Sequence, residues 1–208
     1  DYAHRRLKMM DESRRSELAG RIAEVSQGNF LYVRYVIDDL PTDVDQMADL
    51  SELPMPEDLN DIYGRFLKRE LAHSLDTWDE DYAPLLSALV VARGAGLTST
   101  QLAGIRREPR IKMRRLLRTC GQYLAGPRPD GPFHIYHRSF LEFLLEDNKY
   151  RIYPKDANKA ITNFYWETYA GKWAKCDPYG LRHLPTHLVE VDRSSHLKAI
   201  LLDFDWLQ

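Results

Sequence analysis

Residues 133–145, with the sequence FHIYHRSFLEFLL, decide the fold that we predict for the middle of the chain. Apolar and polar residues alternate up to His137, as they do in a short strand, and then Phe140, Phe143 and Leu144 follow helical spacing. A side chain at such a junction lies beside helix N-terminal amides, which favour anions, so His137 is a candidate ligand contact. A capping or core role for His137 is the alternative that this segment leaves open.

The residues around this segment predict a winged-helix domain over 76–153, beginning at an acidic change of composition in 76–81. Three helices come first, and a hairpin rich in glycine and proline then forms the expected wing. The helices are expected over 82–92, from Thr98 onward and over 109–119, and the strands over 122–125 and 133–137.

The third of these helices is rich in cations, with seven Lys or Arg residues against the single acid Glu108 over 106–118. Its apolar positions leave Arg114, Arg115 and Arg118 pointing outward. A DNA-binding winged helix that uses these arginines is therefore an alternative function. The rest of the chain offers no second basic region, so a solvated face, or one paired with an acidic neighbouring domain, is the other interpretation and nucleic acid is a disfavoured partner.

Helical segments flank the central domain, so the predicted fold class is mainly α. A helical domain is expected over 1–75, in which Asn29 caps a helix over 30–40 that is apolar almost all round and therefore buried on several sides. The start of a second helical domain is expected over 154–208, where one helix carries an aromatic packing ridge.

The composition is that of a globular protein, with 208 residues, 44% hydrophobic, 29% charged and a net charge of −2. Cys120 and Cys176 have no pairing pattern and are expected to be buried free thiols in a reducing compartment. We expect a cytoplasmic protein with no membrane partner, since no run approaches the ~18 apolar residues of a membrane span. We expect an excerpt of a longer chain, because the N-terminus has neither an initiating Met nor a signal segment.

Searches for catalytic patterns find no phosphate-binding loop, nucleophile elbow or paired-cysteine metal site in the sequence. His183 and His187 stand four residues apart on an expected helix, which suits zinc, but no third ligand accompanies them at a convincing spacing. We therefore assign no catalytic and no metal-binding residue, and this segment is not expected to be an enzyme by itself.

Five pieces of the sequence, taken in order, resemble the region after the nucleotide-binding core in signal-transduction ATPases with numerous domains (STAND NTPases) of the NACHT type. They cover nearly the whole chain and occupy residues 28–33, 53–63, 96–98, 136–144 and 179–188. The resemblance implies a helical domain, a winged-helix domain and the start of a second helical domain. It also implies an ATPase switch in innate immunity or antiphage defence, with the phosphate-binding loop upstream and sensor repeats, such as a WD-repeat propeller, downstream.

In that family a histidine at the end of the winged-helix hairpin contacts the β-phosphate of bound ADP and holds the inactive state. The resemblance gives this role to His137, although Arg138 and Ser139 stand where some branches carry an Asp after the histidine. Asn29 and Phe30 fall in the place of a Gly-x-Pro-Leu motif that lines the adenine site, with Phe30 replacing the proline. The implied cofactor is ADP or ATP with Mg, held mainly by the upstream nucleotide-binding domain, and exchange for ATP permits homo-oligomerisation.

The sequence therefore predicts a nucleotide-state sensor and interdomain arm of a larger switch. Two alternatives stay open, namely the DNA-binding regulator described above and a scaffold segment that binds no ligand.

Overall fold

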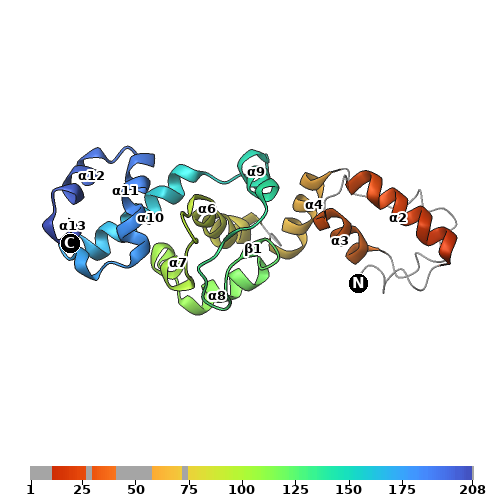
Figure 1. The fold of residues 1–208 in the computed structure, drawn as a ribbon, viewed down its shortest axis with the longest axis horizontal. Helices are drawn as coiled ribbons and strands as arrows, with labels where there is room; N and C mark the ends of the chain where they lie inside the picture. The colour runs from red at the N-terminus through yellow and green to blue at the C-terminus, as the bar shows by residue number, and fades with distance from the viewer. Residues whose placement is uncertain (1–10, 27–29, 41–57, 72–74, 208) are drawn as a thin grey trace. The chain divides into compact units, whose positions relative to one another are not determined.

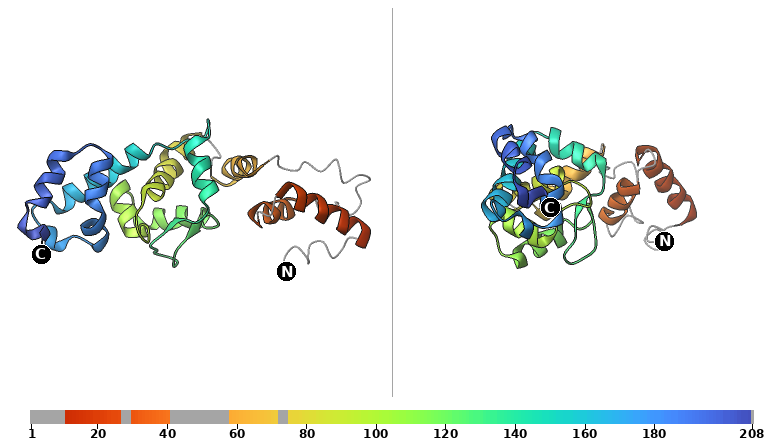
Figure 2. Two further views of the ribbon diagram at one scale, coloured as in Figure 1. Left: turned by 45° about the horizontal axis from the view of Figure 1, so that its top comes forward. Right: turned by 60° about the vertical axis from the view of Figure 1, so that its left-hand side comes forward.

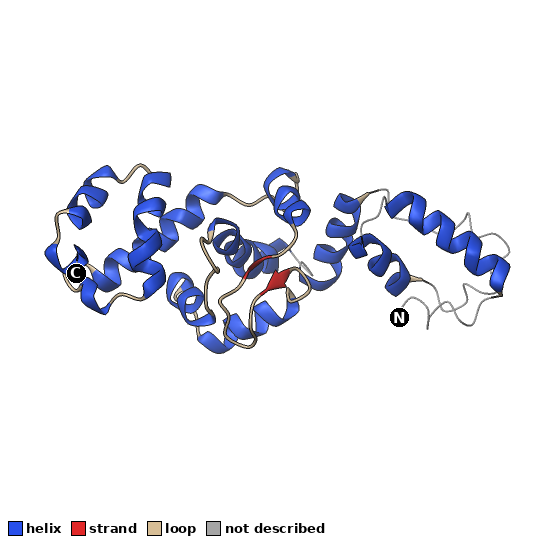
Figure 3. Cartoon of the chain, viewed as in Figure 1, coloured by secondary structure: helices blue, strands red, loops and turns tan. Residues whose placement is uncertain are grey.

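The computed structural model describes residues 11–26, 30–40, 58–71 and 75–207. These residues are mainly helical, and a two-stranded antiparallel sheet is the only sheet among them (Figure 3). The chain divides into two compact units, Asp1–Phe66 and Leu67–Gln208. The helical class expected from the sequence is confirmed.

The N-terminal unit contains the helices α2 (Glu12–Ser26), α3 (Phe30–Asp39) and α4 (Leu59–Phe66). One apolar cluster joins them, and its fully or nearly buried members are Leu18, Ile22, Tyr32, Val36, Ile37, Leu40 and Ile62. Helix α3 is less enclosed than its composition predicts, because Arg34 and Asp38 are exposed and form an ion pair on its solvated side. The predicted cap Asn29 lies outside the described residues.

The C-terminal unit begins with short helical segments and continues into the helices that surround the small sheet (Figure 1). Their bounds are η2 Leu67–Leu71, α5 Leu75–Thr77, η3 Trp78–Tyr82, α6 Ala83–Val91, α7 Ser99–Arg106, α8 Arg110–Thr119, β1 Leu124–Ala125, β2 His134–Ile135 and α9 Arg138–Glu146. Three successive helices followed by a hairpin were expected from the sequence, and α6, α7, α8 and the β1–β2 pair occur in that order. The strands are shorter than predicted, and α9 starts at Arg138, directly after the His137 junction at which the change to helical spacing was expected.

Helix α7 begins where the sequence predicted a helix start. The Thr98 hydroxyl accepts a hydrogen bond from the Gln101 backbone N–H at 3.2 Å, and the Gln101 side chain accepts one from the Thr98 backbone N–H at 2.8 Å. This reciprocal arrangement satisfies backbone donors that the first helical turn leaves without partners. It also fixes the Gln101 side chain at the helix N-terminus.

The sheet pairs Leu124 with Ile135 and Ala125 with His134. An isolated antiparallel bridge extends it on the other side, since Leu97 and Phe133 exchange backbone hydrogen bonds of 2.9 and 3.0 Å. Gly96 permits this approach, because it has φ +100° and a Cβ there would lie 1.9 Å from the Phe133 carbonyl oxygen. Only glycine fits such a backbone position without displacement of the neighbouring strand.

The last part of the chain forms α10 (Pro154–Tyr169), η4 (Trp173–Lys175), α11 (Pro178–Glu190), α12 (Ser194–Leu201) and α13 (Phe204–Leu207). Helix α10 packs against α6 and α7 on one side and against α11 on the other (Figure 2). The expected domain boundary at residue 154 therefore falls within one compact unit. The predicted aromatic ridge is a packing surface, with Tyr165 fully buried and stacked on Tyr179.

Two further expectations concern the cysteines and the membrane. Cys120 and Cys176 are both buried free thiols, as predicted, and burial raises the pKa of each to about 12. Among the described residues, no helix combines the length and the apolar character that crossing a bilayer requires.

Candidate functional site

His137 is the residue that precedes α9, and it has the extended backbone conformation of an N-cap, with φ −94° and ψ 120°. Its side chain makes no capping hydrogen bond, and within the described part of the chain no ion pair or hydrogen bond of the imidazole is found. The ring is half-buried and lies edge-on to Tyr136, with 4.5 Å between the ring centroids. Burial lowers the pKa of His137, which favours the neutral form of the ring.

The position of His137 is fixed from both sides. Before it, the backbone N–H of Tyr136 donates to the Tyr123 carbonyl at 2.9 Å. After it, α9 is anchored by buried Phe140, whose ring stacks on Tyr123 with 4.3 Å between centroids. The backbone at His137 is therefore held by contacts on both sides.

Two other residues, Asn29 and Phe30, were expected to contact the nucleotide. Asn29 lies outside the described residues, and Phe30 begins α3 with a side chain that is also outside the description. Both belong to Asp1–Phe66, whereas His137 belongs to Leu67–Gln208. A shared nucleotide site for these three residues stays a prediction.

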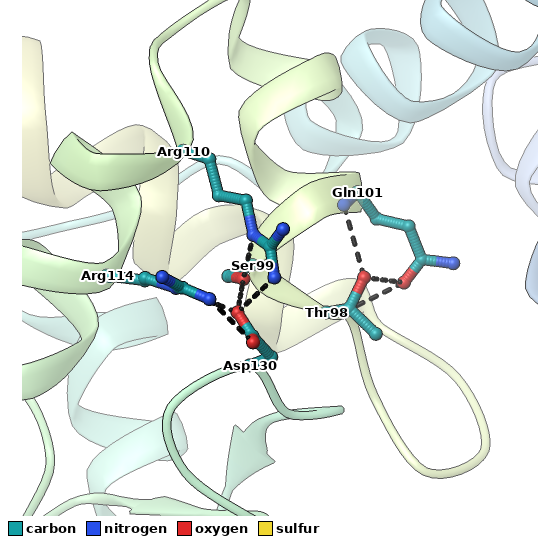
Figure 4. Close-up of polar contacts among 6 residues, drawn as sticks. All are labelled: Thr98, Ser99, Gln101, Arg110, Arg114 and Asp130. Atoms are coloured by element: carbon teal, nitrogen blue, oxygen red, sulfur yellow. Dashed lines mark hydrogen bonds and ion pairs between the residues drawn. The ribbon is translucent and has the colours of Figure 1, made fainter.

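The cation-rich helix of the sequence is α8, and part of its charge is neutralised by one carboxylate. Asp130, in the loop between β1 and β2, accepts two hydrogen bonds from Arg114, at 2.9 and 2.7 Å (Figure 4). Arg110 reaches the same carboxylate at 2.7 Å. The Ser99 hydroxyl donates to it at 2.6 Å, and the Ser99 backbone N–H donates to the Asp130 carbonyl at 2.8 Å. We call Asp130, Arg110, Arg114 and Ser99 the Asp130 clamp.

The clamp shifts the pKa values of its own charged groups. Hydrogen bonds from Arg114, Ser99 and Arg110 hold the pKa of the Asp130 carboxyl well below its ordinary value, and the pairing raises the pKa of Arg114. The pairing therefore favours the ionised form of the Asp130 carboxyl. Arg114 was expected to point outward with its neighbours, but its guanidinium is held by the loop, while Arg115 and Arg118 are exposed.

A second polar cluster was not anticipated as such by the sequence. The Arg93 backbone N–H donates to the Tyr179 hydroxyl oxygen at 3.1 Å, so the Tyr179 O–H is left to donate to His187 Nε2 at 2.9 Å. His187 Nδ1 then carries the proton and donates to Asn158 Oδ1 at 2.6 Å. The Asn158 amide in turn donates to the Pro154 carbonyl at 3.0 Å. We call Tyr179, His187 and Asn158 the buried chain.

His187 is fully buried, and burial, with a smaller contribution from Arg93, lowers its pKa to about 4. Both of its ring nitrogens are used by protein groups, which leaves no lone pair for the zinc ion considered from its spacing with His183. In the described ranges no group of three or more His, Cys, Asp or Glu side chains is arranged to hold a metal ion. His187 is therefore a structural residue.

A neighbouring contact connects α7 with the C-terminal helices. Asp177 caps α11 by accepting from the Gly180 N–H at 2.9 Å, and it also accepts from Tyr165 at 3.1 Å and from Gln101 at 3.0 Å. Asp177 and Asp130 were both missed from the sequence. An Asp before Pro178 is an N-terminal helix signal that would have found the first. No comparable signal marks Asp130, since its partners are more than ten residues away.

No protein-family model matches this sequence, and a comparison with curated proteins found no match either. Function must therefore be argued from the chemistry of these sites.

Proposed function

We propose that this chain is the nucleotide-state-sensing arm of a STAND-type NTPase switch, and that α6, α7, α8 and the β1–β2 hairpin form its winged-helix domain. The observation that carries the proposal is the position of the His137 imidazole, which is half-buried at the junction of β2 and α9. The order of helices and hairpin, with the Leu97–Phe133 bridge beside the hairpin, supports the winged-helix assignment.

The chemistry of His137 suits the cofactor that the resemblance implies. A neutral imidazole donates one N–H, which suits a phosphate oxygen, and the N-terminal amides of α9 favour an anion nearby. ADP or ATP, with Mg, would be held mainly by an upstream nucleotide-binding domain. His137 would contribute a contact that one nucleotide state makes better than the other, since only such a difference shifts an equilibrium between two states.

The test is a single substitution in the full-length protein. His137→Ala removes one hydrogen bond to a charged group, which is worth about 1.5 to 3 kcal/mol, so ADP release is expected to accelerate roughly 10-fold or more. Displacement of a fluorescent ADP analogue measures this rate. His134→Ala, three residues earlier in β2 and exposed, is the matched control.

Equal ADP release from wild type and His137→Ala, with unchanged activation, would favour a scaffold segment that binds no ligand. The DNA-binding alternative has weaker support, because the Asp130 carboxylate already pairs with Arg110 and Arg114 on α8. Sensor repeats downstream, oligomerisation on activation and a cytoplasmic location follow only from the proposed switch.

A further inference from the structure

A cavity of about 450 Å³ lies between α8 and the loop that the Asp130 clamp holds. Four arginines line it, namely Arg114, Arg115, Arg118 and Arg128. Its remaining walls are apolar and consist of Ile111, Leu117, Pro129 and Phe133. We call this cavity the α8 groove. All of it belongs to the C-terminal unit and it is independent of the nucleotide proposal.

The arginines of the groove differ in how their charge is used. Arg114 is bound by Asp130, and Arg128 donates to the Gly121 carbonyl at 2.6 Å. Arg115 and Arg118 make no ion pair or side-chain hydrogen bond with any residue that the structure describes. They stand three residues apart on one helix and therefore present two guanidinium groups on neighbouring turns of the same face.

Ile111 shows that this face is more than a solvated row of charges. It lies four residues before Arg115 on α8 and is 67% exposed. An apolar side chain of this size is stabilised by burial to the extent of about 1.5 to 3 kcal/mol when fully covered. A partner that covers Ile111 and also pairs with Arg115 and Arg118 must therefore combine an apolar side chain with negative charge.

We propose that the α8 groove binds an acidic amphipathic segment of a partner protein. An apolar side chain of that segment covers Ile111 and enters the groove, while its carboxylates pair with Arg115 and Arg118. Arginine suits this role because its guanidinium binds a carboxylate through two parallel hydrogen bonds.

The same features disfavour a nucleic acid in the groove. Phosphate binding depends on cations whose charge is not already neutralised, and Asp130 offsets one of the two positive charges of Arg110 and Arg114 beside it. A phosphate backbone also has no use for the apolar wall, whereas a peptide side chain does.

The test uses the full-length protein and a labelled helical peptide in which one leucine is flanked by glutamates one turn away on each side. Fluorescence anisotropy measures its affinity, together with that of a leucine-to-serine peptide of equal charge and of a short DNA duplex. The expected result is saturable binding of the leucine peptide, several-fold weaker binding of the serine peptide and weaker binding of the duplex.

Arg115→Glu combined with Arg118→Glu is expected to weaken peptide binding at least ten-fold, and Ile111→Ser several-fold. Arg182→Glu combined with Lys198→Glu changes the net charge equally at exposed positions on α11 and α12 and should leave binding unchanged. If charge reversal disturbs folding, Arg115→Gln with Arg118→Gln tests the same loss. Equal losses from both pairs of variants would overturn the proposal, as would tighter binding of the duplex that depends on Arg115 and Arg118.

Discussion

The Asp130 clamp and the buried chain both tie together segments that are distant in sequence, but they do so in opposite environments. The clamp joins a loop to α8 through full charges whose side chains are between a third and a half exposed. The buried chain joins α10, α11 and the segment after α6 through neutral groups, with His187 fully enclosed. Charge is thus placed where water can solvate it, and neutral hydrogen bonds are placed where water is excluded.

The two clusters are therefore expected to affect different properties of the molecule. Exposed ion pairs contribute about 0 to 1 kcal/mol each because water and salt screen them, yet their geometry holds the loop against the helix. A buried donor that loses its acceptor costs more, since it can no longer bond to water. We therefore expect the clamp to control the α8 groove and the buried chain to control the free energy of unfolding.

The largest effect is expected from Asn158→Ala. The substitution leaves the His187 Nδ1–H buried without its acceptor, which should lower the free energy of unfolding by about 2 to 3 kcal/mol. Urea unfolding followed by circular dichroism measures the loss. Asn163→Ala, at an exposed position of the same helix, is the control and should change stability little. Equal losses in the two variants would show that the hydrogen bond between His187 and Asn158 does not stabilise the fold.

Acid should reproduce much of this loss. Burial holds the pKa of His187 at about 4, against 6.5 for the ordinary group, so the unfolded chain takes up a proton that the folded chain refuses. Stability is complete above pH 6.5 and falls as the pH decreases toward 4, by up to about 3 kcal/mol. The carboxyl of Asp130 contributes only below its ordinary pKa of 3.8. Burial also lowers the pKa of His137 and of His183, so these two groups add to the loss in the same direction.

Unfolding free energies measured between pH 7 and pH 4 check this expectation. His187→Gln is less stable at pH 7 but should lose the steep part of the pH dependence. His183→Gln, one turn earlier on α11 and only half-buried, should keep most of it. An unchanged slope in His187→Gln would assign the acid sensitivity to another group.

The contrast between the two clusters also explains what could be predicted from the sequence. Local signals were sufficient for the helices, because capping residues such as Thr98 and apolar spacing as in residues 140–144 act over a few positions. The groups that complete each cluster were not predictable. Asp130 meets Ser99 across 31 positions and His187 meets Asn158 across 29, and no periodicity in the sequence encodes such pairs.

The candidate site residues show the same limit. The junction at His137 was predictable, because the change from strand to helix spacing is local, and the helix does begin beside it. The outward direction of Arg114 was predicted incorrectly in part, since helical spacing cannot show that a carboxylate from a later loop lies over that position. Arg115 and Arg118, which have no such partner in the described ranges, lie as expected.

A smaller effect is expected from Asp130→Asn. The amide can still accept from Ser99 but carries no charge for Arg110 and Arg114, so the loop should open more often while global unfolding changes less than in Asn158→Ala. Hydrogen exchange of the Ser99 and Gly131 amides, whose N–H groups donate to Asp130 and Pro127 of the loop, measures the opening, and high salt should speed it in the wild type as well. Asp192→Asn, which removes the exposed carboxylate that pairs with Lys155, is the control. Unaltered exchange at the loop would show that other contacts hold it.

The smallest change is expected from Arg93→Ala, and it separates backbone from side chain at the end of the buried chain. The bond to Tyr179 comes from the Arg93 backbone N–H, which the variant keeps, whereas the guanidinium forms only an exposed pair with Glu190 at 3.0 Å. Stability at pH 7 should therefore change by less than about 1 kcal/mol.

The positive charge of Arg93 also lowers the pKa of His187, as a secondary cause after burial. Removing this charge should raise the pKa of the folded His187 slightly, so the free energy of unfolding should fall slightly less as the pH decreases toward 4. If Arg93→Ala lost as much stability as Asn158→Ala, the exposed ion pair with Glu190 would stabilise this region as much as the buried hydrogen bonds do. The comparison between the two clusters would then be wrong.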